Sequence, residues 1–296
     1  MTTDGPGHAA QSTTADLRFG TPVRVDVAGL THIGLVRPTN EDHFLIARVG
    51  RYFDTIATSL PEGDMPGHTE DTGHVIVVAD GMGGHVAGEV ASRLTIREMV
   101  RVALALPDWI LHIDEATRGA ALTRTEERVV KAHEAVLAQS AREPGLSGMG
   151  STVTGVLNLG RTLQLAHVGD SRAYLWRQGR FMRLTRDHTY VQMLVDAGAM
   201  SAEAAARSRQ RHVLVNAVGG VNEDIRVDVD HVPLERGDRL LICSDGLSDP
   251  VHDNTLAALL GAAANAEQAC RDLLALALDT GGRDNITVAV AIYDWD

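Results

Sequence analysis

The sequence has 296 residues, of which 44% are hydrophobic and 22% are charged, and its formal net charge at pH 7 is -12. This is the composition of an ordinary globular protein, long enough for one large domain or two small ones. The acidic balance argues against a nucleic-acid partner, which would require clustered Lys and Arg. A phosphorylated protein ligand stays open, because it needs only a local positive site.

Cysteine content and hydropathy indicate the cellular compartment of the protein and whether it spans a membrane. Cys243 and Cys270 lie in apolar segments and form no C-x-x-C pair, so we expect two buried free thiols, a reducing cytosol and no cysteine zinc site. Residues 1–22, rich in Thr, Gly, Ala and Asp, are predicted to be a disordered leader without the apolar core of a signal peptide. Because no run of about 18 apolar residues occurs, we expect no membrane span and a cytoplasmic protein.

The first half of the chain predicts strands followed by two long helices. Val23 to Val27 alternates apolar and polar residues, which is typical of a half-buried strand, and Val75 to Ala79 is continuously apolar and ends at Asp80. A Gly-rich turn follows. The elements expected in this half are strands at 23–27, 44–49 and 75–79, a polar loop at 54–73, and helices at 87–106 and 115–140.

The second half predicts an antiparallel meander, a short-helical excursion and a closing strand. Gln178-Gly179 is expected to form a tight turn within the meander. The expected elements are strands at 152–159, 162–168, 173–177 and 180–184, a short-helical segment at 188–220, strands at 225–232 and 239–243, helices at 253–261 and 266–279, and a strand at 286–293. Since helices do not alternate with strands, this order favours mostly antiparallel sheets covered by helices over a doubly wound parallel sheet.

Five acidic motifs occur in turn-forming contexts, most of them directly beside an apolar run. They are 37–42 (RPTNED), 80–84 (DGMGG), 169–172 (GDSR), 244–246 (SDG) and 283–285 (RDN). A carboxylate at the end of a buried strand is costly unless it is paired or binds a metal. One Asp-Gly pair is a common turn, but five such places indicate a shared cation site. Carboxylate and carbonyl oxygens suit Mg²⁺ or Mn²⁺, which points to a metal-dependent hydrolase.

Other catalytic patterns are absent from the sequence. It contains no G-x-x-x-x-G-K-[ST] loop, no G-x-S-x-G elbow and no H-E-x-x-H pair among its 13 histidines. No Arg follows Cys243 at the spacing of a cysteine phosphatase. These absences leave metal-assisted hydrolysis as the chemistry that the motifs favour.

In this order, the five motifs resemble those of the metal-dependent Ser/Thr protein phosphatases, the PPM or type-2C family, in its bacterial form. The resemblance covers about residues 24–293, and the motifs are specific only as a set. It implies an α+β fold, a four-layer αββα sandwich of two mostly antiparallel sheets flanked by helix pairs. It also implies a single catalytic domain over residues 23–296, with a variable flap at about 188–222.

The same resemblance implies the roles of the principal site residues. Asp80 would bridge two Mn²⁺ or Mg²⁺ ions, Asp245 and Asp284 would complete the first ion, and the Gly81 carbonyl would hold the second. Arg37 would bind the phosphate with its planar donor fork. Two ions about 3.5–4 Å apart can activate a bridging water for in-line attack without a covalent enzyme intermediate.

Further roles follow from the resemblance with alternatives left open. Glu41 and Asp42 would act on the second ion directly or through water, and Asp170 would hold a third, weaker ion shared with Asp245. Met82 stands where many eukaryotic relatives carry His, and Met cannot donate a proton. The proton donor could therefore be a water at the Asp170 site or His188.

Other charged side chains of the site region have more than one interpretation. Arg207, Arg209 and Arg211 either attract acidic phosphopeptides or belong to a solvated helix face, and Arg172 is expected to pair with a nearby carboxylate. Asp249 and Asn285 are expected to support the metal ligands.

The predicted function is a phosphoserine/phosphothreonine protein phosphatase that reverses Ser/Thr kinase signalling. The expected partners are phosphorylated Ser/Thr proteins, including the kinases themselves, and the expected state is a monomer. Two alternatives remain at this stage. One is a regulator of the same fold that acts on a single phosphoprotein of an anti-sigma pathway, and the other is a pseudo-enzyme that binds phosphoproteins without turnover.

Overall fold

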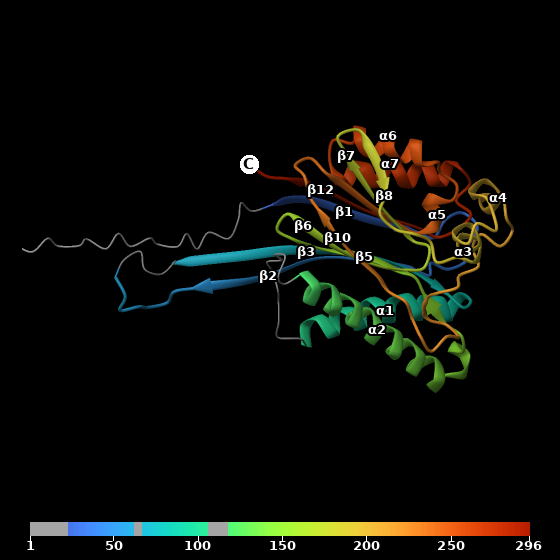
Figure 1. Ribbon diagram of the computed structural model, residues 1–296, viewed down its shortest axis with the longest axis horizontal. Coiled ribbons are helices and arrows are strands. Elements are labelled where there is room, and N and C mark those ends of the chain that lie inside the picture. Colours follow the sequence, from blue (N-terminus) through green and yellow to red (C-terminus); the bar gives the residue numbers. More distant parts are fainter. Residues whose placement is uncertain (1–22, 62–66, 106–117) are drawn as a thin grey trace, which may run out of the picture.

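The computed structural model describes residues 23–61, 67–105 and 118–296. Over these residues, two antiparallel sheets stack face to face, and a pair of helices covers the outer face of each sheet (Figure 1). The predicted αββα sandwich is thereby confirmed. The predicted leader at 1–22 and the predicted start of the second long helix at 115–117 lie outside the described residues.

The first sheet has β11 (Arg239–Cys243) at its centre, with the closing strand β12 (Ile286–Asp294) beside it. Its strands, in spatial order, are β1 (Arg24–His32), β12, β11, β7 (Arg172–Arg177) and β8 (Arg180–Arg183). Along β12, Val288 and Val290 pack toward the helices, whereas Ala289 and Ala291 pack toward the other sheet. Because both faces are buried, this strand is an unbroken apolar run rather than an alternating one.

The second sheet contains the longest strands. Its strands are β10 (Asp228–Pro233), β6 (Thr162–Val168), β5 (Val153–Leu159) and β3 (His68–Met82), with β2 (Asp42–Asp54) paired to β3 and the short β4 (Gly150–Ser151) and β9 (Val218–Gly219) beyond its end. The β2–β3 ladder runs from Asp42 opposite Asp80 to Asp54 opposite His68. Strand structure therefore extends into the predicted polar loop at 54–73, because ladder pairing continues past the apolar residues.

The helices cover the sheets as the amphipathic patterns require. They are α1 (His85–Ala105) and α2 (Arg118–Arg142) on the second sheet, α6 (Asp253–Ala262) and α7 (Ala266–Asp279) on the first, and the short η1 (Pro144–Leu146), α3 (Tyr190–Asp196), α4 (Ala202–Ala206) and α5 (Asp245–Ser248). In α7, Asn265 caps the first turn by accepting a hydrogen bond from Gln268 N, and Ala269, Cys270 and Leu273 are buried.

Several local predictions are confirmed and one is corrected. Gln178 and Gly179 both have positive φ angles, 49° and 82°, as a two-residue hairpin turn requires. Cys243 and Cys270 are buried free thiols. The strand expected at 225–232 begins only at Asp228, where pairing with β6 starts. None of the helices in the described part of the chain is long and apolar enough to cross a membrane.

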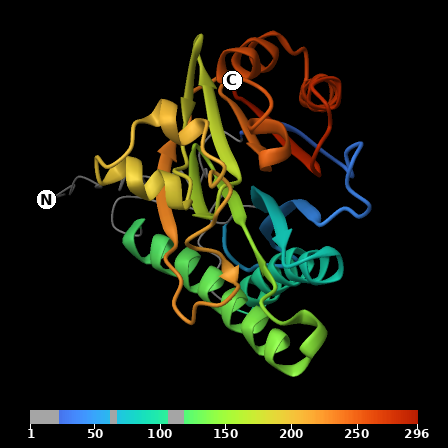
Figure 2. The same ribbon diagram turned by 90° about the vertical axis from the view of Figure 1, so that its right-hand side faces the viewer.

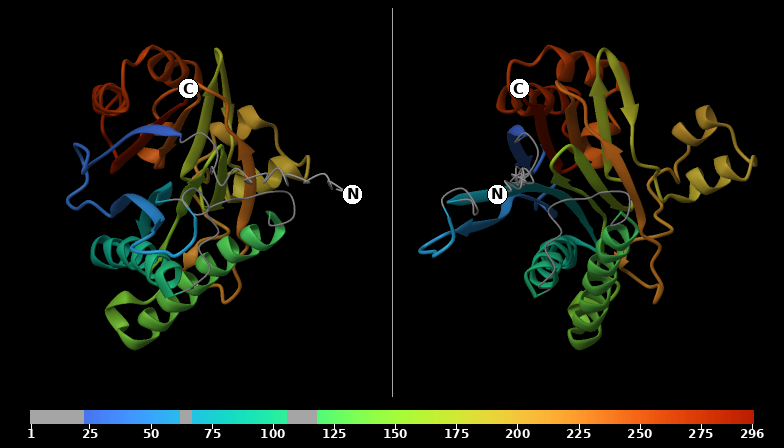
Figure 3. Two further views of the ribbon diagram at one scale, coloured as in Figure 1. Left: turned by 90° about the vertical axis from the view of Figure 1, so that its left-hand side faces the viewer. Right: turned by 60° about the vertical axis from the view of Figure 1, so that its left-hand side comes forward.

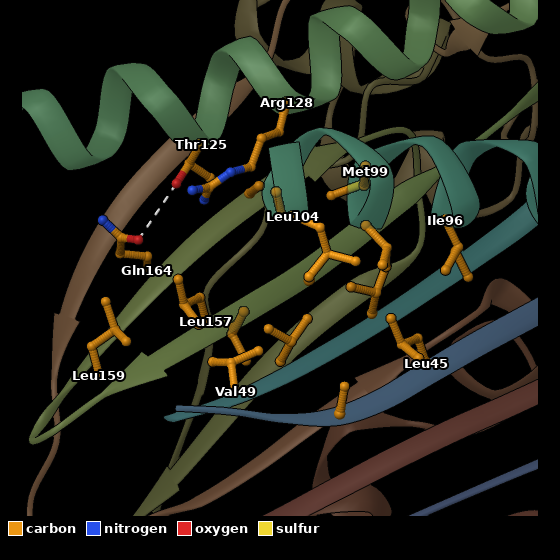
Figure 4. A pocket seen from close by; sticks show the side chains of 18 residues that line it. Leu45, Val49, Ile96, Met99, Leu104, Thr125, Arg128, Leu157, Leu159 and Gln164 are labelled. Atoms are coloured by element: carbon orange, nitrogen blue, oxygen red, sulfur yellow. Dashed lines mark hydrogen bonds between the residues drawn. The ribbon is translucent and has the colours of Figure 1, made fainter. Parts of the chain in front are cut away.

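An apolar cavity of about 150 Å³ lies between the second sheet and its helices. Leu45 and Leu157 line it from the sheet, and Leu104 lines it from α1 (Figure 4). Arg128 reaches it from α2, and its Nε is buried without a hydrogen-bond partner. This cavity shares no lining residue with the acidic cavity at one end of the sandwich.

Candidate metal centre

Strand pairing brings the acidic motifs to one end of the sandwich. Asp42 opens β2 opposite Asp80 near the end of β3, and Cys243 at the end of β11 pairs with Val288 near the start of β12. The turn between β6 and β7 carries Asp170 to the same end. The end lies at the right of Figure 1, near α3 and α5, and faces the viewer in Figure 2.

A cavity of about 390 Å³ opens at this end, and all the predicted site residues except Asp42 line it. The lining residues are Arg37, Glu41, Asp80, Gly81, Met82, Gly83, Gly84, Thr152, Asp170, His212, Leu214, Asp245, Asp284 and Asn285. The fold therefore gathers residues from six segments, and from the flap, around one space.

Asp80 has a backbone held by hydrogen bonds and a carboxylate that has no partner among the described residues. Its N–H donates to Thr152 Oγ1 at 3.0 Å, and its carbonyl accepts from Thr152 N at 2.8 Å and from Ser151 Oγ at 3.0 Å. The carboxylate itself makes no hydrogen bond or ion pair with the described residues. Burial, followed by repulsion from Asp42, Asp245 and Asp170, raises the pKa of Asp80 well above its usual value. A bound cation would relieve both costs.

Asn285, directly before β12, holds the loop at 33–41 through three hydrogen bonds. Its Oδ1 accepts from Glu41 N at 2.8 Å, and its Nδ2 donates to the carbonyls of Ile33 and Thr39 at 2.9 Å each. This loop presents Arg37, whose Nη2 donates to Asp284 Oδ2 at 2.7 Å. That hydrogen bond raises the pKa of Arg37, so the guanidinium stays charged beside the carboxylates.

Asp42 is placed differently from the other predicted ligands. It is buried, and its Oδ2 accepts from Ser244 Oγ at 2.7 Å, while Ser244 Oγ accepts from Thr287 N at 3.0 Å. Its Oδ1 is buried without a hydrogen-bond partner. Burial raises the pKa of Asp42 to about 7. Since Asp42 does not line the cavity, its placement favours an indirect role over direct contact with an ion.

Asp245 and Asp170 line the cavity from α5 and from the β6–β7 turn. Asp245 is the first residue of α5, and Gly246 after it packs so closely that an added Cβ would lie 1.9 Å from Asn285 O. Burial and the neighbouring Asp245 raise the pKa of Asp170. The α5 turn was not expected from the sequence, because four residues give no periodic pattern.

The flap, residues 188–222, corrects one candidate and supplies another. His188 is buried, where Nδ1 accepts from Gly169 N at 3.2 Å and Nε2 bonds Asp228 Oδ2 at 3.0 Å. It does not line the cavity, so the structure removes it as a proton donor to a ligand there. His212 lines the cavity instead, with Nδ1 3.3 Å from Asp245 Oδ2.

Sequence reasoning missed His212 because no pattern in 207–213 fixes which side chains turn inward. The neighbouring arginines differ from one another. Arg211 forms an ion pair with Asp249, with Nε 3.5 Å from Oδ2, so this arginine contacts the residue that follows α5. Arg207 lies just after the end of α4. Arg172 pairs with Asp187 at 2.7 Å, as expected.

The donor set fits hard divalent cations. Carboxylates dominate the lining, and those of Asp80 and Asp170 have no partner among the described residues. Burial, followed by repulsion from neighbouring carboxylates, raises the pKa values of both residues. Such a group of unpaired oxygens is what Mg²⁺ and Mn²⁺ bind. Gly81 allows the close backbone approach, because an added Cβ would lie 2.0 Å from Gly88 O.

Comparisons with known proteins show the family of this chain. The family model described as protein phosphatase 2C matches residues 55–281, so the chain belongs to the protein phosphatase 2C family. It is 43% identical over 224 residues to the serine/threonine protein phosphatase PstP of Mycobacterium tuberculosis, covering 75% of this chain and 41% of that protein. The chain thus spans about two fifths of the length of that relative.

Other relatives match over most of both chains. The serine/threonine phosphatase stp of Listeria monocytogenes is 32% identical over 236 residues, which cover 77% of this chain and 91% of that protein. The crystal structure of the catalytic domain of PstP in complex with two manganese ions superposes with a TM-score of 0.72 at 34% identity. That superposition covers 92% of this chain and 100% of the other.

Proposed function

We propose that this chain is a phosphoserine/phosphothreonine protein phosphatase that uses two Mn²⁺ or Mg²⁺ ions in its active site. The observation that carries the proposal is the cavity where Asp80, Asp245 and Asp284, from three distant segments, lie together with Arg37. Membership of the protein phosphatase 2C family supports it.

In this proposal each acidic residue of the cavity has a defined role in holding the two ions. Asp80 would bridge both ions, Asp245 and Asp284 would complete one ion, and the Gly81 carbonyl with Glu41 would hold the other. Bound ions would supply a nucleophilic water near neutral pH and neutralise the phosphoryl oxygens. Hydrogen bonds between the backbone of Asp80 and the side chains of Thr152 and Ser151 fix the position of this residue in the cavity.

Two further acids would act less directly. Asp42 accepts from Ser244 and does not line the cavity, so we assign it to the support of the second ion through water or through its neighbours. Asp170 would hold a third ion with Asp245, because it lines the cavity and its carboxylate has no partner among the described residues.

Arg37 would bind the phosphate of the substrate. A guanidinium has five N–H donors, and the described residues accept only from Nη2, through Asp284. Its remaining donors can bind two phosphate oxygens while the contact with Asp284 keeps the side chain beside the cavity. Met82 lines the cavity and cannot donate a proton, so a water at Asp170 remains the proposed donor to the leaving alkoxide.

The proposed substrates are phosphorylated Ser/Thr proteins, including Ser/Thr kinases, acted on by a monomer in the cytoplasm. Charged side chains dominate the lining of the cavity, which suits a phosphorylated side chain better than an apolar small molecule. The acidic net charge of -12 supports the expectation of no nucleic-acid partner.

Hydrolysis of a phosphothreonine peptide tests the proposal. The assay compares Mn²⁺, Mg²⁺ and EDTA for the unaltered chain, for Asp245→Asn and for the control Asp224→Asn, an exposed acid outside the cavity. We expect activity that requires an added ion, is lost in Asp245→Asn and is kept in Asp224→Asn. Peptide binding without turnover under every condition would reject the enzyme in favour of a pseudo-phosphatase.

A further inference from the structure

The flap places an imidazole beside two core carboxylates. Asp170, His212 and Asp245 can each offer one ligand atom, and these atoms all lie within 4.8 Å of one another. Asp170 comes from the β6–β7 turn and Asp245 from the first turn of α5, whereas His212 lies between α4 and β9 in the flap. The α3 and α4 helices of the flap project beside the sandwich (Figure 3, right, gold). A cation here would therefore connect the flap to the core.

Asp170 indicates independently that this place is built for a ligand. The residue is only 9% exposed, and its carboxylate makes no hydrogen bond or ion pair with any residue in the described ranges. It nevertheless lines the cavity. A carboxylate this buried is costly without a partner, and the space it faces is the one that His212 and Asp245 also line.

The His212 ring is oriented as a ligand would be. Nδ1 lies 3.3 Å from Asp245 Oδ2, and Nε2 lies 3.1 Å from Asp249 Oδ2. A metal-bound histidine usually donates its second N–H to a carboxylate, which fixes the tautomer and the ring plane. The adjacent backbone is also held, because Val213 O accepts from Tyr190 N at 2.8 Å.

We propose that His212 binds, through Nδ1, a divalent transition-metal ion that it holds together with Asp170 and Asp245, with Asp249 orienting the ring. The inference rests on the proposed phosphatase site, because Asp245 is shared with that site. Its new element is a nitrogen ligand from the flap. Occupancy of this position fastens the flap over the cavity, since His212 and Leu214 line the same space as Arg37.

The nitrogen ligand determines which ion the position selects. Carboxylate and carbonyl oxygens accept Mg²⁺ and Mn²⁺ alike, whereas imidazole favours first-row transition metals over Mg²⁺. All the other expected ligand atoms of the site are carboxylate or carbonyl oxygens. The His212 position should therefore keep Mn²⁺ in an excess of Mg²⁺ that displaces Mn²⁺ from the oxygen-only positions.

The competing interpretation is that a protonated His212 only forms ion pairs with Asp245 and Asp249. Mn²⁺ alone is the probe that separates the two. The full chain is loaded with Mn²⁺, the bound ions are counted by equilibrium dialysis, and nitrogen coordination is read by electron spin-echo envelope modulation. His212→Ala is compared with His68→Ala, an exposed histidine on β3 outside the cavity, and with Asp249→Asn.

We expect nitrogen modulation in the unaltered chain and in His68→Ala. His212→Ala should lose this signal and bind one Mn²⁺ fewer, and Asp249→Asn should weaken the last Mn²⁺ by about 10–100-fold. Three results would each overturn the inference and leave the proposed function standing. His212→Ala could still bind three Mn²⁺ ions, the loaded unaltered chain could show no nitrogen signal, or that chain could bind only two Mn²⁺ ions. No bound Mn²⁺ at all would reject both.

Discussion

Asp42→Asn should stabilise the metal-free protein, and more so as the pH rises. Asp42 is buried, its Oδ1 has no hydrogen-bond partner, and burial raises its pKa from 3.8 to about 7. The folded state thus holds a proton that the unfolded state releases between these values, so ionisation costs stability as the pH rises through this window. For a single site this cost is about 2 kcal/mol at pH 5 and about 4 kcal/mol at pH 8. Asn cannot ionise and can still accept from Ser244.

The assay is urea unfolding in EDTA at pH 5 and pH 8, with the free energy of unfolding extrapolated to zero denaturant. The stability of Asp42→Asn relative to the unaltered protein should increase by about 2.5 kcal/mol between the two pH values. Asp224→Asn, at an exposed position, serves as the control and should show no such trend. A constant difference between Asp42→Asn and the unaltered protein at both pH values would refute the argument that a buried, ionisable Asp42 opposes folding.

Three further predictions concern substrate binding, core burial and backbone contact. Arg37→Ala should lower kcat/KM for a phosphothreonine peptide by about 10–150-fold, mainly through KM, because a charged hydrogen bond to phosphate is worth about 1.5–3 kcal/mol. Arg128→Met should raise the free energy of unfolding in urea by about 1–3 kcal/mol, since burial lowers the pKa of Arg128 and its Nε has no partner beside the apolar cavity. Gly246→Ala should lower the melting temperature and weaken Mn²⁺ binding in calorimetry, because the new Cβ would meet Asn285 O at 1.9 Å and displace the neighbouring ligands.

Each of these predictions has a control and a contrary result. For Arg37, the control is Arg24→Ala, which disturbs only exposed ion pairs with Asp294 and Asp296, and an unchanged kcat/KM in Arg37→Ala would remove that residue from the site. For Arg128, the control is Arg97→Met on the exposed face of α1, and a loss of stability in Arg128→Met would show that the guanidinium is satisfied. For Gly246, the control is Gly145→Ala, where an added Cβ would meet nothing within 4 Å, and normal Mn²⁺ binding in Gly246→Ala would show that the α5 turn tolerates a shift.

Periodic segments could be predicted closely from the sequence. The strand at 162–168 and the helix at 266–279 occur with the predicted bounds, because each has an uninterrupted apolar pattern that matches its burial. The β2–β3 hairpin is longer than predicted because residues 68–72 of β3 are polar and are held in the strand by ladder pairing with β2. Short α5 carries no pattern at all and was missed.

In the site, too, some residues could be predicted from the sequence and others could not. The motifs predicted which acids would line the cavity, because each acid follows or precedes a strand whose position the fold fixes. They could not predict that Asp42 would turn toward Ser244, nor that His212 rather than His188 would reach the cavity. Those outcomes depend on the side-chain packing of two sheets and on the path of the flap, which no local pattern encodes.

The most direct test of the account is to measure bound Mn²⁺ and phosphothreonine-peptide hydrolysis in the same samples across a Mn²⁺ titration, for the unaltered chain and for Asp80→Asn. We predict that hydrolysis rises only as two ions bind, stops with EDTA, and falls at least about 100-fold in Asp80→Asn together with the loss of bound Mn²⁺. Hydrolysis that persists in EDTA, or an Asp80→Asn variant that turns over like the unaltered protein, would contradict a metal centre built on Asp80.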